Sequence, residues 1–302
     1  MGKLSKSRAV LLIAFLVTVW GINWPLSKIA LAYTPPILFS GMRTLLGGLM
    51  LLAVAMRHRE RLQFKRVWKI YAISALVNVV LYYGLQTIGL HYMPAGLFSA
   101  IVFLQPVLVG VLSWMFLGEA MYGLKMLGLL LGFAGVGLIS SGGLSGHVSG
   151  VGIVLALASA LSWAIGTIYV KKVSSIVDPI WLVTIQLIEG GLFMTLIGMV
   201  VENTSDIQWT SAYVLSLLFI ALFVIAIGWV VFYYLINAGE ASKVASYTFL
   251  IPLIAILIGT LFLNEPFTLT LVAGLALILC SIILVNRTPR RLRRKIAEQL
   301  PS

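Results

Sequence analysis

The chain is poor in charged residues and in cysteine. Asp, Glu, Lys and Arg make up 10% of its 302 residues, whereas 61% are hydrophobic. Soluble proteins carry about 25% charged residues, so this chain has too few polar groups to cover a water-facing globule. The single cysteine, Cys280, excludes a disulfide scaffold and a zinc or iron–sulfur site held by cysteines. These shortages exclude an ordinary soluble domain and indicate that the solvent is a bilayer.

Motifs for metal binding and nucleotide binding are also missing. The three histidines, His58, His91 and His147, lie far apart and lack the spacing of metal ligands. The sequence contains no GxxxxGK[ST] phosphate-binding motif and no cluster of Asp, His or Ser at one depth, which an intramembrane enzyme would need. We therefore expect no metal, no cofactor, no enzymatic activity and no ATP-driven pumping by this chain alone.

Long apolar runs dominate what is present. A transmembrane helix needs about 20 mostly apolar residues. Ten such runs predict an all-α membrane protein with ten transmembrane helices, and they cover approximately Ala9–Ala32, Pro36–Met56, Ile70–Leu90, Pro94–Leu117, Gly123–Ser140, Gly150–Val170, Ile180–Val201, Ser211–Ile236, Ala241–Leu263 and Thr268–Val285. The first run is longer than the apolar region of a signal peptide, so we expect it to stay in the membrane.

The positive charge, formally +12 at pH 7, is unevenly placed. All Lys and Arg residues except Lys28 and Arg43 fall at the amino-terminus, at the carboxy-terminus or in alternate loops. This bias predicts that both termini are cytoplasmic, because positive residues stay on that side. The charge is then a topology signal, and we expect no nucleic-acid partner.

The segment after the last span is strongly basic. In Thr288–Leu300 an apolar row of Leu292, Ile296 and Leu300 stands among five Lys and Arg residues. The segment is suited to lie on the anionic cytoplasmic leaflet of the bilayer. A disordered tail that acts only as a stop signal explains the composition equally well.

The two halves of the chain share landmarks at a nearly constant offset. Early landmarks recur 143 positions later and later ones 146 positions later: Trp20, Lys28, Pro36, Gly47 and Gly48 match Trp163, Lys171, Pro179, Gly190 and Gly191, while Phe103, Pro106, Phe116, Glu119 and Gly128 match Phe249, Pro252, Phe262, Glu265 and Gly274. Each half holds five spans, an odd number, so the second half must enter the membrane in the opposite sense. The prediction is an inverted repeat with units 1–146 and 147–286 and a basic tail, 287–302.

With these motifs the chain resembles the ten-helix EamA-type permeases of the drug/metabolite transporter superfamily. The resemblance covers nearly the whole chain and is carried by Trp20-Gly21-Ile22-Asn23, by Lys28 and Arg43, and by the two segments Phe116-Leu117-Gly118-Glu119 and Phe262-Leu263-Asn264-Glu265-Pro266. It implies a transporter with a central cavity bounded by helices 1, 3, 4, 6, 8 and 9.

Substrate sites of repeat transporters are expected near the midplane of the membrane, on broken or polar helices. Trp20 and Trp163 lie near mid-span beside Asn23 and Thr167, and we favour cavity lining over packing for both tryptophans. Asn78, Tyr82 and Gln86 form an i, i+4, i+8 stripe. The predicted substrate-binding set is Trp20, Asn23, Asn78, Tyr82, Gln86, Gln105, Trp163, Thr167, Tyr247 and Thr248.

Pro106 and Pro252 lie near the centres of helices 4 and 9, and each frees a backbone carbonyl one turn earlier. They could act as hinges or simply kink the helices for packing. Glu119 and Glu265 fall at the ends of spans. We expect them to terminate helices and to form hydrogen bonds at the gated ends of the cavity.

Charged residues inside a bilayer are candidates for function, and here they are Lys28, Arg43 and Glu189. Lys28 can extend toward the outer surface. Arg43 and Glu189 lie on helices that the repeat makes equivalent, and they could pair across the symmetry axis. Glu189 is the acidic residue placed well inside a span and so the candidate for proton coupling; if it lies outside the cavity, facilitation or exchange is the better expectation.

These features predict an alternating-access carrier in the cell membrane that exports small metabolites, amino acids or related amphiphilic compounds. Lipid or hydrophobic-drug transport within the same superfamily is the alternative, and an intramembrane enzyme is a weaker one. The expected partners are a small-molecule substrate and the lipid bilayer with its anionic cytoplasmic leaflet. Gly128, Gly132 and Gly135 form a small-residue ridge, which favours close packing within a monomer over packing in a homodimer.

Overall fold

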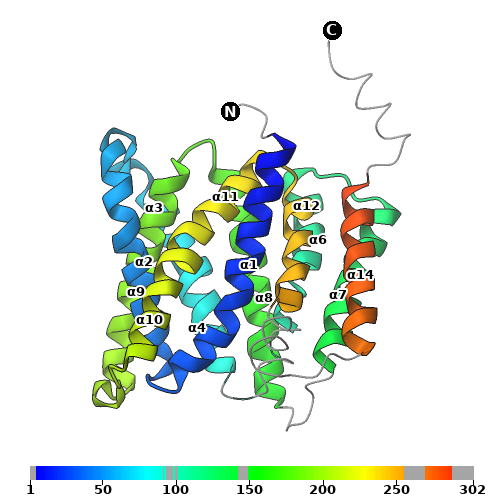
Figure 1. The fold of residues 1–302 in the computed structure, drawn as a ribbon. Helices are drawn as coiled ribbons and strands as arrows, with labels where there is room; N and C mark the ends of the chain where they lie inside the picture. Colours follow the sequence, from blue (N-terminus) through cyan, green and yellow to red (C-terminus); the bar gives the residue numbers. More distant parts are fainter. Residues whose placement is uncertain are drawn as a thin grey trace.

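The computed structural model describes residues 5–90, 92, 98, 101–141, 149–254 and 269–287, and within them every regular element is a helix. Figure 1 shows a bundle of helices that run roughly along one axis, with the start of α1 and the end of α14 at the same end of the bundle. Six segments are long and apolar enough to cross a bilayer: Lys6–Leu31, Pro36–Arg61, Phe64–Gly89, Gly150–Val173, Pro179–Val201 and Ser211–Ala238. Shorter apolar helices accompany them.

The first half of the described chain holds α1 (Lys6–Leu31), α2 (Pro36–Ala55), η1 (Met56–Arg61), α3 (Phe64–Ala75), η2 (Leu76–Leu81), α4 (Tyr82–Gly89), α6 (Gln105–Leu117) and α7 (Gly123–Ser141). The second half holds α8 (Gly150–Val173), α9 (Pro179–Val201), η3 (Thr204–Asp206), α10 (Ser211–Phe219), η4 (Ile220–Ile227), α11 (Gly228–Ala238), α12 (Ala241–Ser246), η5 (Tyr247–Phe249) and α14 (Leu269–Asn286).

These helices agree closely with most of the predicted spans. The third begins at Phe64, earlier than the predicted Ile70, because the polar residues Lys65, Arg66 and Lys69 are part of its first turns. The spans predicted over Pro94–Leu117 and Ala241–Leu263 are described only in part, so the count of ten stays a prediction. The inverted repeat and the cytoplasmic placement of the termini also stay predictions. Glu265, the tail Thr288–Leu300, and the histidines His91 and His147 lie outside the described residues.

Helix starts follow from local chemistry. Ser5 accepts a hydrogen bond from the backbone N–H of Arg8 at the start of α1, and Asp178 accepts from the N–H groups of Ile180 and Trp181 at the start of α9. Both α2 and α9 have proline in their first turn, where its missing N–H is not needed. The start of α2 is capped from a distance, since Glu202 accepts from the N–H groups of Ile37 and Leu38 at 2.9 and 2.7 Å.

Glycines let α2 and α9 pack with their backbones in contact. A Cβ built on Gly191 of α9 would lie 2.3 Å from the backbone nitrogen of Leu45, and one on Gly48 of α2 would lie 2.9 Å from that of Ile188. Leu45 and Ile188 are themselves 143 positions apart, as are Gly48 and Gly191. The contact is therefore reciprocal: each helix places the same glycine against the same position of the other.

The ridge Gly128, Gly132 and Gly135 of α7 packs inside the protomer. A Cβ on Gly128 would lie 3.0 Å from the carbonyl oxygen of Ser281, and one on Gly135 would lie 2.8 Å from that of Gly274, both in α14. Ser281 and Gly274 stand 146 positions after Gly135 and Gly128 respectively, so this contact is reciprocal too. Helix pairs that pack this closely need small residues at the contact.

Two spans contain π-helical segments near their centres. The segment η2 joins α3 to α4, and η4 joins α10 to α11. A π turn widens the helix and leaves backbone carbonyls with poorer internal partners. Ser162 of α8 donates to the carbonyl of Val77 in η2, and Trp20 of α1 donates to the carbonyl of Val224 in η4, at 2.8 and 3.1 Å. The widened turns thus face α8 and α1.

The two predicted proline sites also coincide with irregular backbone. The chain turns at Phe103 and Leu104, and α6 begins at Gln105 with Pro106 in its first turn. Pro252 follows the 3₁₀ segment η5, and both prolines are buried. Broken helices are therefore present where Pro106 and Pro252 predict them, beside the centre of the bundle.

Candidate functional site

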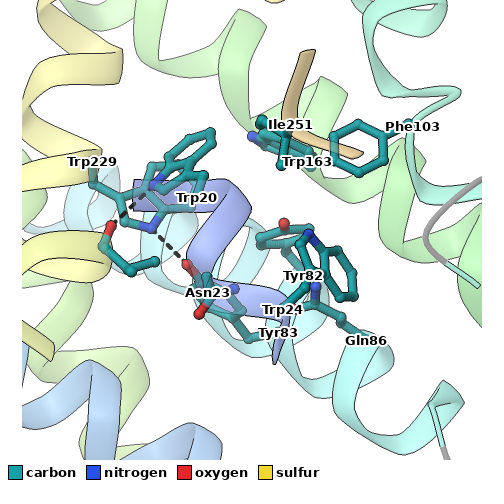
Figure 2. A pocket seen from close by; sticks show the side chains of 11 residues that line it. Trp20, Asn23, Trp24, Tyr82, Tyr83, Gln86, Phe103, Trp163, Trp229 and Ile251 are labelled. Atoms are coloured by element: carbon teal, nitrogen blue, oxygen red, sulfur yellow. Dashed lines mark hydrogen bonds between the residues drawn. The ribbon is translucent and has the colours of Figure 1, made fainter. Parts of the chain in front are cut away.

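A cavity lined mostly by aromatic side chains lies at the centre of the bundle. It has an empty volume of about 360 Å³ and is lined by Trp20, Asn23, Trp24, Tyr82, Tyr83, Gln86, Phe103, Trp163, Val224, Trp229 and Ile251. Figure 2 shows these side chains converging from α1, α4, α8, α11 and the segments around Phe103 and Ile251. Both halves of the chain therefore build one cavity.

Ring contacts fix the shape of this cavity. The ring centroid of Trp20 lies 5.6 Å from that of Trp163 and 5.9 Å from that of Trp229. Tyr82 lies 5.1 Å from Trp163. Tilted and edge-on arrangements at these distances are favourable for aromatic pairs. The walls therefore offer large apolar faces suited to a planar or apolar group.

Two of the contacts join residues at equivalent positions of the sequence repeat. Trp20 and Trp163 are 143 positions apart and pack ring to ring. Tyr83 and Trp229 are 146 positions apart, and the indole N–H of Trp229 donates to the hydroxyl of Tyr83 at 2.8 Å. Residues from the two halves that match in the sequence repeat therefore meet each other at the cavity.

A second pocket adjoins the aromatic cavity. It has an empty volume of about 250 Å³, and it shares Asn23, Trp24 and Gln86 with the cavity. Its other lining residues are Ser27, Leu31, Phe39, Arg43, Thr87 and Leu90. The predicted intramembrane charge Arg43 therefore lies next to the central cavity.

The two pockets contain residues with unpaired buried polar atoms. Three such atoms are buried and have no hydrogen-bond partner among the described residues: the side-chain oxygen of Gln86, the indole N–H of Trp163 and the Nε of Arg43. A buried polar group without a partner costs free energy, and a ligand or water can remove that cost. The cavity thus combines apolar walls with a small number of donors and acceptors.

The structure brings five of the ten predicted substrate-binding residues to this cavity: Trp20, Asn23, Tyr82, Gln86 and Trp163. The hydroxyl of Thr167 donates to the carbonyl of Trp163, and that of Thr248 donates to the carbonyl of Ala245, so both are engaged within their own helices. Gln105 is fully buried, and Tyr247 is half-buried. These residues, with Asn78, do not line the two central pockets.

Asn78 is separated from Tyr82 and Gln86 by the π turn. Asn78 lies inside η2, where the helix is wider, so the i, i+4, i+8 spacing no longer keeps the three residues on one face. Its amide nitrogen donates to Ser74 at 3.2 Å and lies 3.5 Å from the side-chain oxygen of Gln186. Gln186 in turn exchanges hydrogen bonds with Tyr233. Asn78 therefore joins a polar network between helices and is not part of the cavity wall.

Sequence reasoning missed Trp24, Tyr83, Phe103, Val224, Trp229 and Ile251. The repeat carried a usable signal for two of them, because Tyr83 and Trp229 are paired aromatics at the offset of 146. Phe103 served only as a repeat landmark. Val224 and Ile251 are ordinary apolar residues, and nothing in the sequence distinguishes them from lipid-facing ones.

The other predicted charges lie elsewhere. Glu189 lines a separate apolar pocket of about 550 Å³ with Ala72, Ala75, Leu76, Val80, Gly190 and Phe193, several of which are exposed on the outer face of the bundle. No ion pair joins Arg43 to Glu189 among the described residues, and the two line different pockets. The side chain of Lys28 lies outside the described part of the structure.

An ion-pair network joins the two halves of the chain at one end of the bundle. The helix α6 ends at Gly118, whose φ of 67° suits glycine, and the chain then presents Glu119 to the start of α12. Glu119 accepts hydrogen bonds from the N–H groups of Ala241 and Ser242, at 2.5 and 3.3 Å, and from the Ser242 hydroxyl. Lys125, fully buried, and Lys171 lie 3.5 and 3.7 Å from its carboxylate. The end of α6 is thereby tied to the second half of the chain.

The surroundings of Glu119 change its acidity. Burial acts to raise the pKa of this carboxyl, but the hydrogen bonds from Ser242 and Ala241 and the charges of Lys125 and Lys171 outweigh it, so the pKa is lowered. Glu119 is therefore ionised at neutral pH. Glu240 extends the network, with its carboxylate 3.2 Å from Lys125 and 2.5 Å from Lys243.

Within the described residues no group of three or more His, Cys, Asp or Glu is arranged to hold a metal ion. His58 is exposed in η1, where its backbone carbonyl accepts from the indole N–H of Trp181.

Comparison with known proteins follows the same division of the chain. The EamA-like transporter family matches twice, over residues 7–141 and 150–287. The chain therefore belongs to the EamA-like transporter family, a family of membrane transporters. It is 60% identical to the uncharacterized transporter YvbV of Bacillus subtilis over 286 residues, which cover 95% of this chain and 94% of that protein.

More distant relatives span most of the chain as well. The probable amino-acid metabolite efflux pump of Escherichia coli is 26% identical over 287 residues, which cover 88% of this chain and 90% of that protein. A solved crystal structure superposes with a TM-score of 0.81 at 17% sequence identity, covering 97% of this chain and 99% of the other. That likeness shows a shared fold.

Proposed function

We propose that the chain is a secondary transporter of the cell membrane that exports small amphiphilic metabolites, amino acids among them, by alternating access between two inverted repeats. The observation that carries the proposal is the aromatic cavity, because both halves of the chain line it and Trp20 meets its repeat counterpart Trp163 there. A cavity between two inverted repeats can open to either side when the two halves exchange conformations. The name of the Escherichia coli relative supports amino-acid metabolites and outward transport.

The reciprocal helix contacts support the inverted repeat. α2 packs on α9 and α7 packs on α14 through glycines at the repeat offsets. The family also matches the two halves separately. The network around Glu119 supports a state that is closed at one end of the bundle, which the positive-residue bias assigns to the cytoplasm.

Counterflow in proteoliposomes tests the proposal. Vesicles are loaded with an unlabelled compound, and uptake of labelled amino acids and related metabolites is followed with and without a pH gradient. We expect uptake by the wild type and a loss of about tenfold or more in Trp163→Ala, because truncation removes a wall of the cavity. Trp163 suits this test because its indole N–H has no partner among the described residues, so its truncation breaks no side-chain hydrogen bond there.

Trp114→Ala is the matched control, because Trp114 is 55% exposed and lies outside the central pockets. It should transport like the wild type. Equal losses in the two variants, or no counterflow of any compound by folded wild-type protein, would contradict transport through the aromatic cavity.

Transport of lipids or hydrophobic drugs is the second candidate, and the pocket beside Glu189 favours it. That pocket opens between η2 and α9 among apolar side chains, some of them exposed where lipid would lie. Phe193→Trp would narrow it without touching the central cavity. The second candidate predicts that the wild type moves a fluorescent lipid analogue and shows no amino-acid counterflow. It also predicts that Phe193→Trp loses the movement of the lipid analogue.

A further inference from the structure

Arg43 is a buried cation without an acidic partner. Its side chain is 2% exposed within α2, and among the described residues no carboxylate lies within ion-pair distance of its guanidinium. Arginine stays protonated in proteins, so the charge cannot be removed by titration. An isolated charge inside a bilayer is costly, and buried ions are normally paired. The arrangement calls for an anion that the described chain does not supply.

The contacts that Arg43 does make leave part of its hydrogen-bonding capacity unused. One terminal nitrogen donates to the hydroxyl of Ser27 at 3.3 Å, and the guanidinium lies over the rings of Phe39 and Tyr83, 4.9 and 4.7 Å from their centroids. Aromatic faces hold a cation in place without neutralising it. The Nε has no partner among the described residues. This donor of the guanidinium is therefore available.

Arg43 also lies where a compound in the aromatic cavity can reach it. Its pocket shares Asn23, Trp24 and Gln86 with that cavity. Tyr83 connects the two spaces, because its ring covers the guanidinium while its hydroxyl accepts from Trp229. A molecule whose apolar body lies against the tryptophans can extend a short polar group toward Arg43.

We propose that Arg43 binds the carboxylate of the transported compound, so that the substrates are small monocarboxylates with an aromatic or apolar body. The proposal rests on the proposed transport function and adds the substrate class to it. The planar guanidinium matches a carboxylate and can donate two parallel hydrogen bonds to it. In a low-dielectric pocket this pair also satisfies a cation that would otherwise stay uncompensated.

The charge of the substrate follows from the number of cations. Among the side chains that the structure describes, Arg43 supplies the positive charge of the two central pockets, and no second Lys or Arg lines them. A dianion would bring one negative charge without a partner into a buried site, which is unfavourable. A single carboxylate neutralises the charge of Arg43.

A short hydrogen-bonded chain connects this subsite to the aromatic cavity. Arg43 donates to Ser27, and the hydroxyl of Ser27 donates to the side-chain oxygen of Asn23 at 3.1 Å. Asn23 lines both pockets. These hydrogen bonds fix the guanidinium relative to the aromatic walls. The carboxylate and the apolar body of a substrate are then recognised at a set distance from each other.

Equilibrium binding tests the proposal independently of transport. Purified protein in lipid nanodiscs is titrated with matched pairs that differ only in charge: phenylalanine and phenylalaninamide, leucine and leucinamide, 3-phenylpropionate and its amide. Quenching of tryptophan fluorescence reports occupancy, because four tryptophans line the cavity. We expect at least one acid to bind about tenfold or more tightly than its amide.

Arg43→Gln should abolish this preference while amide binding stays within about twofold. Arg66→Gln is the matched control, since Arg66 is exposed at the start of α3 and lines neither pocket. It should keep the preference of the wild type. A preference for acids that survives in folded Arg43→Gln overturns the proposal, as does a wild type that binds no acid more tightly than its amide.

Ser27→Asp is a second variant for the case in which Arg43→Gln does not fold. It places a carboxylate where Ser27 now accepts from Arg43, so it forms the ion pair internally. We expect a raised melting temperature together with loss of the preference for acids. A variant that still prefers acids overturns the proposal.

Counterflow by the same proteins separates the two hypotheses. Acid binding that depends on Arg43 but without any counterflow supports the anion subsite and contradicts the transport function. Counterflow of acids and amides alike, unchanged in Arg43→Gln, supports the transport function and overturns the subsite.

Discussion

Glu189 and Arg43 are both ionisable residues inside spans, and their surroundings assign them to different tasks. Arg43 adjoins the aromatic cavity, whereas Glu189 lines an apolar pocket on the outer side of η2 and α9. A carboxylate that drives antiport must meet the substrate or the path of the proton through the cavity. Glu189 does neither in this structure, so exchange or facilitation is the transport mode that we infer.

We expect Glu189→Gln to retain counterflow, with any dependence on external pH the same as in the wild type. The substitution keeps the size of the side chain and removes only its charge, in a pocket that shares no residue with the central cavity. Counterflow at several external pH values, with the wild type in parallel, provides the measurement. Loss of the pH response in the variant would restore Glu189 as the proton carrier.

Glu119 gives stability a dependence on pH. Its pKa is lower in the folded protein than in the unfolded chain, so its contribution is complete above the unfolded value and is lost as the pH falls through the folded value. We expect the melting temperature of the wild type to drop below about pH 4. Glu119→Gln should melt at a lower temperature at pH 7 and respond less to acidification. Identical pH profiles for the two proteins would contradict this assignment.

At the scale of helices, glycines lie where two helices pack with their backbones in contact. Gly191 in α9 touches the backbone of α2, whereas a Cβ on Gly84 in α4 would make only an ordinary contact, 3.7 Å from the side chain of Met194. Two chemically identical substitutions should therefore have very different costs. The difference depends on whether the neighbour is backbone or a flexible side chain.

We expect Gly191→Ala to lower the free energy of unfolding by about 2 kcal/mol, because the two helices must move apart. Gly84→Ala should change it by less than about 1 kcal/mol. Unfolding in mixed micelles with increasing sodium dodecyl sulfate gives both values. If the two variants prove equally stable, the close approach of α2 and α9 is not rigid.

The sequence predicts helices better than it predicts which faces they present. Apolar length identifies the spans, and a mid-span tryptophan next to a polar residue identifies Trp20 and Trp163. The π segments leave no comparable signal, because Leu76–Leu81 and Ile220–Ile227 read as ordinary apolar helix. Their extra width moves Asn78 out of line with Tyr82. Tyr83 and Trp229 are found from the sequence only when the two halves are compared residue by residue at the offset of 146, and not at a few landmark positions alone.

For the molecule as a whole, the placement of charge predicts the orientation in the membrane. The exposed residue His58 in η1 and the network around Glu119 belong to the side on which Lys and Arg accumulate, whereas Ser205 in η3 belongs to loops without Lys or Arg. The proposed orientation places η1 in the cytoplasm and η3 outside.

Cysteine labelling tests this orientation. In a Cys280→Ser background, Ser205→Cys should react with a membrane-impermeant maleimide in intact cells. His58→Cys should react only after the membrane is permeabilised. Both positions are exposed, so access to the reagent depends on the side of the membrane. The reverse pattern would invert the topology and turn the end closed by Glu119 outward.

The reciprocal glycine contacts have a consequence for biosynthesis. α2 and α7 are made early, but the glycine surfaces along which they pack are covered by α9 and α14, which are made later. The glycine surface of α2 therefore faces lipid until α9 has been synthesised, and that of α7 faces lipid until α14 has been synthesised. During that interval the same surfaces can join two newborn first halves to each other. We expect assembly to be faithful when α9 and α14 are synthesised before such chains meet.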